Sequence, residues 1–372
     1  INILFKNFFI ITMGLIVYCL VGFNLMYPGD FNIIDAFGGI LGFAGPGLDA
    51  VAAADLSYSE GYTYWTDFLF QGMFAATAGT IISGAVAGRI KINAFMLIVF
   101  LYVLIVYPIV GSWQWGGGFL STFTDEVGFY DFAGSTLVHS VGGWGGLVII
   151  YLLGARKGKF DSSGKAVAIP GSNIPLSAAG VLILWLGWFG FNGGSVLSAD
   201  PANTSLVLVT TCLAAAAGGL GASFLSTLMY KNLDITMFMN GVLGGLVGIT
   251  AGADQMGPTS AIIIGAIGGA VVVLGVALLD KCKLDDPVGA IPVHLFAGIW
   301  GTLAVGLFGA SAGFDQFMVQ LASTGIVGVF CVIGASIIAL IVKSIMGLRV
   351  SDEEEEIGLD ISEHGTKAYF SS

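Results

Sequence analysis

The segment DFAGSTLVHSVGG, residues 131–143, puts a histidine inside one of the most apolar regions of the sequence. A second segment, DPVGAIPVHLFAGIW at residues 286–300, follows the same plan. Each has an aspartate eight residues before its histidine, a cluster of small residues between the two, and a Trp-Gly pair shortly afterwards. The chain therefore contains an internal repeat with an ionisable ring at the same position in each copy.

The composition around these segments is that of a membrane protein. Of 372 residues, 56% are hydrophobic and 10% are charged, and the mean hydropathy is +0.91, far from the values of soluble domains. Apolar runs of about 20 residues recur, long enough to cross a ~30 Å hydrocarbon core as helices. None alternates as barrel strands do. We expect an all-α polytopic protein with ten spans, at residues 8–27, 66–86, 93–111, 132–154, 174–197, 203–229, 237–253, 260–280, 288–309 and 321–346.

The charged residues separate between the two sides of this predicted membrane. With ten spans and an inside N-terminus, all thirteen Lys and Arg residues fall at inner positions, which agrees with the positive-inside rule and predicts a cytoplasmic C-terminus. No basic stripe suggests nucleic-acid binding. The outer side carries twelve acids, which either concentrate cations or are simply solvated loop residues. They are Asp30, Asp35, Asp49, Asp55, Glu60, Asp67, Asp125, Glu126, Asp131, Asp200, Asp254 and Asp315.

In this topology the two copies of the repeat are inverted. Asp131 begins its helix at the outer face and Asp286 begins its helix at the inner face. Eight residues of helix rise ~12 Å, so His139 and His294 both reach the middle of a ~30 Å core. Inverted repeats with a site near the midplane are a recurrent transporter architecture. We expect an inverted-repeat helical bundle around a central pore, with the two rings face to face.

The histidines have two possible roles. An ionisable group inside a membrane usually faces a partner or a conduction path, whereas a single ring can also be held by hydrogen bonds within the bundle. A facing pair of neutral imidazoles can share a proton and pass hydrogen bonds to a small polar solute. Asp131 can act as a helix N-cap, and Asp285 and Asp286 before Pro287 have the pattern of a cap with Pro in the first turn.

Aromatic residues gather near the predicted outer ends of several spans. Phe70 and Phe74 lie four residues apart on one helical face, Trp115 lies at an outer helix end, and Phe191 is followed one turn later by Ser195. Each of these alone is typical of core packing or an interfacial belt. Together they suit a small cation resting against aromatic faces.

Glycines at four-residue spacing and a polar tail complete the organisation of the chain. Small-xxx-small faces let helix backbones approach closely in lipid, and they predict a tight bundle. We assign residues 1–346 to the membrane domain and residues 347–372, which include a run of four glutamates, to a cytoplasmic tail. The glycine pairs are Gly142/Gly146, Gly241/Gly245, Gly244/Gly248 and Gly265/Gly269.

Several of these segments resemble the ammonium transporter (Amt) family, relatives of the Rh glycoproteins, over nearly the whole chain. The tail resembles the Amt branch. The family has eleven spans, and INILFKNFF at the start of this chain resembles the beginning of its second helix, so we expect that the first helix is missing and that the chain is a fragment. The matching segments are FQGMFA (70–75), GRI (88–90), WGGG (115–118), DFAGSTLVH (131–139), GWFGFNGGS (187–195), DDPVGAIPVH (285–294) and GLR...GLDISEHGTKAY (347–369).

The resemblance implies a function and a set of site residues. Family members are plasma-membrane homotrimers with one pore per subunit that carry ammonium, in some cases methylammonium, and a PII-type protein can dock on their cytoplasmic face. By motif match, Trp115, Phe74 and Ser195 would recruit ammonium. Phe74 and Phe191 would form a gate, His139 and His294 would line the conduction path, Asp131 would support the outer site, and Phe70 would lie beside the path. The resemblance implies no cofactor or metal.

Two other readings remain open from the sequence. The same fold can serve as an ammonium sensor that signals through its tail or a fused domain. Alternatively, two facing histidines can ligate haem in a membrane redox protein. An enzyme is not expected, because no Ser/His/Asp or metal constellation emerges from the sequence.

Overall fold

The computed structural model describes residues 1–48, 58–59, 61–124 and 127–369. Nine helical segments of this described part are long and apolar enough to cross a membrane, and a shorter apolar helix, α10, lies among them. The predicted all-α membrane bundle is confirmed. Of the outer acids predicted above, Asp49, Asp55, Glu60, Asp125 and Glu126 lie outside the described residues.

The first half of the bundle has four membrane-length segments. They are α1 (Asn2–Val17) continuing through Tyr18–Gly22 into α2 (Phe23–Met26), α4 (Tyr64–Ala85), α5 (Ile92–Leu101) continuing through Tyr102–Val106 into α6 (Tyr107–Ser112), and Ser135–Ser140 continuing into α7 (Val141–Leu153).

The second half begins at α8 and is followed by a long helix and a short tail. Its elements are α8 (Ile174–Trp188) continuing into Phe189–Gly193, α9 (Pro201–Tyr230), α10 (Ile235–Thr250), α11 (Pro258–Lys281), and Ile291–Phe296 continuing into α12 (Ala297–Phe308). Then come α13 (Phe314–Met346), α14 (Asp352–Ile357) and α15 (Leu359–His364).

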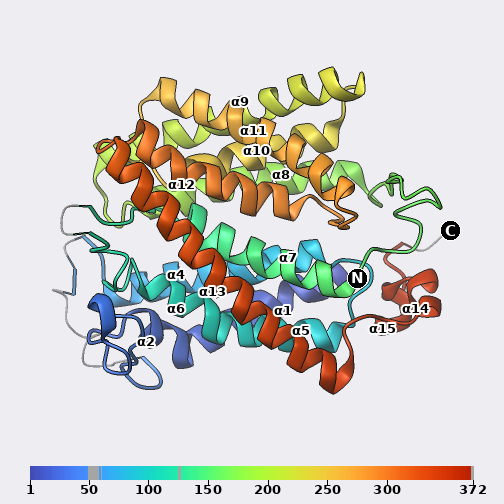
Figure 1. The fold of residues 1–372 in the computed structure, drawn as a ribbon, viewed down its shortest axis with the longest axis horizontal. Coiled ribbons are helices and arrows are strands. Elements are labelled where there is room, and N and C mark those ends of the chain that lie inside the picture. Colours follow the sequence, from blue (N-terminus) through green and yellow to red (C-terminus); the bar gives the residue numbers. More distant parts are fainter. Residues whose placement is uncertain (49–57, 60, 125–126, 370–372) are drawn as a thin grey trace.

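The two halves pack in the same way. α1 contacts α4 and α4 contacts α7, while in the second half α9 contacts α10 and α10 contacts α12. In Figure 1 the halves lie one above the other, and α13 runs diagonally across both. We call the end that carries the tail and Arg156 the basic end, and the opposite end, with the loop of Asp30 and Asp35, the acidic end.

The inverted repeat appears as two matching helix starts at opposite ends. The Asp131 carboxylate accepts hydrogen bonds from four backbone N–H groups, those of residues 134–137, at 2.8–2.9 Å. Asp286 accepts from the N–H groups of residues 288, 289 and 291 at 2.7–3.4 Å. The third residue after each aspartate is a glycine with positive φ, 103° at Gly134 and 76° at Gly289. That conformation suits glycine because it has no Cβ, so both turns are built the same way.

Both histidines, and Phe191, lie in π-helical turns. His139 is in Ser135–Ser140, Phe191 in Phe189–Gly193 and His294 in Ile291–Phe296. Such wide turns are rare and occur frequently at functional sites. They were not predicted, because a wide turn keeps an apolar composition and carries no pattern of its own.

Glycine faces bring the helices of the second half into backbone contact, as their spacing predicts. A Cβ placed on Gly245 or on Gly265 would overlap the carbonyl oxygen of Ala214 in α9, and one on Gly269 would overlap that of Gly218. α9 therefore packs closely against both α10 and α11, which also contact each other.

The span predicted at residues 237–253 corresponds to α10, which is shorter than the nine membrane-length segments. α10 has 16 residues, which rise only ~24 Å, and the chain turns at residues 251–255. Ten of its residues are buried, so protein rather than lipid surrounds most of its length. The first span, in contrast, begins at Asn2 rather than at residue 8.

The close approach of α9 and α10 predicts a specific stability effect. Gly245→Ala should lower the free energy of unfolding by about 1–3 kcal/mol, because an added methyl forces the backbones apart. Gly180→Ala in α8 is the matched control, since its Cβ would meet no atom within 4 Å and alanine favours helix. Thermal unfolding of the two variants in detergent measures the difference; equal melting temperatures would contradict the packing described here.

Candidate functional site

Aromatic rings form a connected column that leads from the acidic end towards the histidines. The ring centroids of Trp115 and Phe74 are 5.9 Å apart, and those of Phe74 and Phe191 are 4.2 Å apart in a stacked arrangement. Phe70 lies beside Phe74 at 4.5 Å. The structure thus brings together four residues from α4, the end of α6 and the end of α8. Phe74 is 2% exposed, so the column closes the way inward.

Polar groups lie next to this column. Ser195 is buried, and its hydroxyl donates to the carbonyl oxygen of Phe191 at 2.8 Å. The indole N–H of Trp115 donates to the backbone carbonyl of Asp131 at 3.0 Å. The outermost ring is therefore tied directly to the helix start that leads to His139.

The two histidines meet at the inner end of the column. Their Nδ1 atoms are 3.1 Å apart and their ring centroids 5.1 Å apart, with an interplanar angle of 18°. Two neutral imidazoles can make this bond only if one Nδ1 carries the hydrogen and the other accepts it. His139 is 1% exposed, and its Nε2 has no partner among the described residues. The inverted repeat thus delivers the expected contact.

Sequence reasoning missed Trp188 as a neighbour of this pair. Its ring stacks on His139 with a centroid distance of 5.2 Å and an angle of 12°, while Phe191 lies 5.1 Å from the same imidazole. The segment GWFGFNGGS contains Trp188, but only its phenylalanine and serine were singled out. The position of Trp188 one turn before Phe191 would have been the available signal.

A buried hydrogen-bond network holds Trp188 in this orientation. Its indole N–H donates to the Thr250 hydroxyl at 3.0 Å. The Thr250 hydroxyl also lies 3.2 Å from the Asn192 side-chain oxygen, and the Asn192 amide donates to Thr211 at 3.0 Å. Because the N–H is already bonded, Trp188 presents its ring face to His139.

Asp131 is fully buried and forms hydrogen bonds through both its backbone carbonyl and its carboxylate. Burying a carboxylate is costly unless hydrogen bonds replace water. Here four N–H groups at the start of a helix supply them, and the helix dipole adds to their effect. The sequence left open whether Asp131 is a cap or a support for the outer site, and it has the contacts of both.

At the basic end, arginine side chains hold the second helix start. Arg89 is fully buried and donates to the carbonyl oxygens of Ala85, Ala87, Gly154 and Asp285 at 2.6–3.2 Å. It therefore joins the ends of α4 and α7 to the residue that precedes the second cap.

Arg156 binds the side chain of the same aspartate. Its backbone N–H and its guanidinium donate to the Asp285 carboxylate at 2.8–2.9 Å. Burial acts to raise the pKa of Asp285, but these hydrogen bonds outweigh it, so the pKa lies below its usual value. Asp285 is therefore ionised at neutral pH and fixes the chain next to Asp286.

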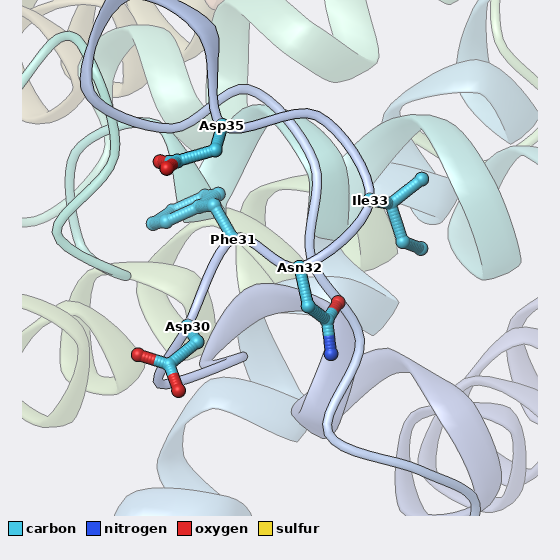
Figure 2. Close-up of a pocket in the computed structure, with 5 residues that line it drawn as sticks. All are labelled: Asp30, Phe31, Asn32, Ile33 and Asp35. Carbon is cyan, nitrogen blue, oxygen red and sulfur yellow. The ribbon is translucent and has the colours of Figure 1, made fainter.

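Two hollows open on the surface near the acidic end and beside the column. A cavity of about 360 Å³ is lined by residues 30–33 and Asp35, and Figure 2 shows Asp30 and Asp35 on either side of the Phe31 ring. An apolar groove of about 600 Å³ lies between α4 and α8, and Phe70, Phe74 and Phe191 are among its lining residues. The groove therefore reaches the column from its side.

This geometry does not fit a haem held by the two histidines. A haem iron ligated by two histidines has to lie between the ligating nitrogens. The direct contact of the Nδ1 atoms leaves no space for an iron there. Within the described residues, no group of three or more His, Cys, Asp or Glu side chains is placed to hold a metal ion.

Comparisons with known proteins agree on one family. The sequence profile of the Ammonium Transporter Family matches residues 1–369. Ammonium transporter Amt2 of Archaeoglobus fulgidus is 40% identical over 99% of this chain and 81% of its own length. A solved structure titled Sensor Amt Protein is 33% identical, with a TM-score of 0.86 over 96% of this chain and 89% of that one. Mep2 of Candida albicans is 25% identical, with a TM-score of 0.81 over 96% of this chain and 81% of its own.

Loss of the Thr250 hydroxyl should release Trp188. Thr250→Val leaves the buried indole N–H without a partner, which costs about 1–3 kcal/mol of stability and should alter the near-UV circular dichroism of the tryptophans. Thr211→Val is the control, because it removes a hydroxyl from the same network without touching Trp188. If both variants give the same spectrum as the parent, Thr250 does not hold the indole in place.

Proposed function

Because the chain belongs to the ammonium transporter family, we propose that it moves ammonium across the plasma membrane by binding NH₄⁺, removing a proton and conducting NH₃ past His139 and His294. The observation that carries this proposal is the 3.1 Å contact between the two histidines at the end of the aromatic column. Neither histidine is in an ion pair within the described residues. A pair without a fixed charge is free to exchange protons.

Ammonium binds first at the acidic end, at Trp115, Phe74 and Ser195. A small cation is attracted to the faces of aromatic rings. The oxygen of the Ser195 hydroxyl can accept a hydrogen bond from one N–H group of the ammonium ion. Asp131 supports this site through the bond from Trp115 to its carbonyl. Acidic residues such as Asp30 and Asp35 raise the local concentration of cations.

Deprotonation is the step that separates ammonium from potassium. The two ions are alike in charge and size, so aromatic rings alone discriminate poorly between them. Beyond the stacked Phe74 and Phe191 the passage is apolar, and a bare cation is costly there. Ammonium can lose its proton and continue as neutral ammonia. The proton then moves separately along His139 and His294, so net charge crosses with the solute.

The surroundings of the pore are proposed on the same basis. The basic end faces the cytoplasm, and residues 347–372 form a tail there with which a PII-type protein can interact. Three large apolar side chains of α8, Leu182, Ile183 and Leu186, are 66–69% exposed. Lipid or a neighbouring subunit has to cover them, which is consistent with a homotrimer of membrane domains, residues 1–346.

An ammonium sensor is the second candidate. It is favoured by the likeness to the structure titled Sensor Amt Protein, which has a TM-score of 0.86. Uptake of radiolabelled methylammonium by transporter-deficient cells that express this chain separates the two functions. A transporter supports uptake above the background of the host cells, whereas a sensor binds ammonium without supporting it.

Removing either imidazole should change selectivity. We expect His139→Ala or His294→Ala to stop the ammonium-driven current or to lower the selectivity for ammonium over potassium by about tenfold or more, equivalent to about 1.4 kcal/mol. The reason is that the smaller alanine side chain leaves room for water in the passage, so a hydrated cation can pass without losing a proton. Current recordings in proteoliposomes measure both quantities. His364→Ala in the tail is the control, and variants at 139 and 294 that behave like it would rule out the proposed route.

A further inference from the structure

Gln320 of α13 makes more hydrogen bonds than its place in an apolar helix suggests. The side chain is fully buried. Its oxygen accepts from the backbone N–H of Tyr130 at 2.9 Å, and its nitrogen donates to the carbonyl oxygens of Tyr130 at 2.7 Å and Thr302 at 3.0 Å. Gln316, one turn earlier, donates to the side-chain oxygen of Gln320 at 3.1 Å. The amide thus pairs with both backbone groups of one residue, which fixes its orientation.

Tyr130 immediately precedes Asp131, so these bonds belong to a closed circuit. Asp131 accepts from the backbone N–H of Thr136 at 2.8 Å. The hydroxyl of Thr136 bonds that of Thr302 at 2.7 Å, and the carbonyl of Thr302 returns to Gln320. The circuit joins the first half, the second half and α13, which lies outside the repeat.

Pairing is selective on this face of α13. Ser323 and Thr324 lie about one turn further along α13 and are also buried. Their hydroxyls, however, have no hydrogen-bond partner among the described residues. Burial of polar side chains alone therefore does not explain the contacts of Gln320. Two of its bonds go to Tyr130. The next residue, Asp131, provides both the carboxylate that caps the helix and the carbonyl that accepts from Trp115.

We propose that Gln320 is a positioning residue for the outer ammonium site. Among the described residues it makes no hydrogen bond to the rings of the column. It acts by fixing the backbone of Tyr130 and Asp131, and through them the indole of Trp115 and the start of the helix that carries His139. This inference rests on the proposed function, since it concerns the affinity of that site. α13 thereby contributes to substrate affinity although it lies outside both halves of the repeat.

The test compares matched substitutions on the same helix face, Gln320→Met and Gln316→Met. Both delete a buried amide. Gln316→Met removes the bonds to the Gly128 carbonyl and to the Gln320 oxygen, but only Gln320→Met breaks the two bonds to the backbone of Tyr130. Two readouts are taken: methylammonium uptake by intact cells, and the ammonium concentration that gives half of the ligand-induced rise in melting temperature of the purified full chain. The second readout reports binding whether the protein transports or only senses ammonium.

We expect Gln320→Met to raise both half-saturating concentrations by about tenfold while the maximal uptake rate changes less than about threefold. Gln316→Met should shift them by less than about twofold. Equal shifts in the two variants, or no shift at 320, would overturn the role of Gln320. If Gln320→Met does not fold, Gln320→Glu keeps the length and the acceptor but has at most one donor in place of the two N–H groups, and an unchanged half-saturating concentration in that variant would overturn the role equally. A parent that binds ammonium without uptake would instead refute transport.

Discussion

The pore depends on a buried carboxylate that begins a helix inside the protein. Asp131 exchanges water for four N–H groups of the next turn, so a charge that would be costly in an apolar interior becomes a fixed starting point for the chain. Because the same cap recurs at Asp286 in inverted orientation, each helix begins the same number of residues before its histidine. This equality of length brings the two imidazoles to the same depth, where their Nδ1 atoms lie 3.1 Å apart.

The aromatic rings of the column determine the electrostatic surroundings of the two histidines. His139 lies against Trp188, Phe191 and His294, and none of these groups carries a permanent charge. A proton on the pair is therefore stabilised only by ring faces and by the other imidazole, which keeps it transferable. In the proposed mechanism this weak stabilisation is needed, because a neighbouring carboxylate would hold the proton and stop its passage.

The sequence alone predicted the membrane helices and the pairing of the two histidines. The length of each apolar run and the eight-residue interval between each aspartate and its histidine can be read directly from the residue order. The sequence was not sufficient for contacts made to backbone atoms. Gln320 and Arg89 bond carbonyl and N–H groups, which every residue possesses, so no partner residue types mark the pairing. Trp188 was overlooked for a related reason: its partner Thr250 lies 62 residues away.

The two helix starts are held by different chemistry, and the difference matches what passes each of them. At the basic end Asp285 is held by two guanidinium groups, those of Arg89 and Arg156. At the acidic end the equivalent position is held by the neutral amide of Gln320. A fixed positive charge beside the entry would repel an arriving cation strongly in a medium of low dielectric constant. Beyond the histidines the proposed solute is neutral ammonia, which a guanidinium does not repel, whereas the proton that moves separately still has to pass these groups. If both helix starts were held by the same residue type, a neutral amide would bind the basic end less strongly, or a guanidinium would repel cations at the acidic end. Gln320 departs from the symmetry of the repeat and avoids both.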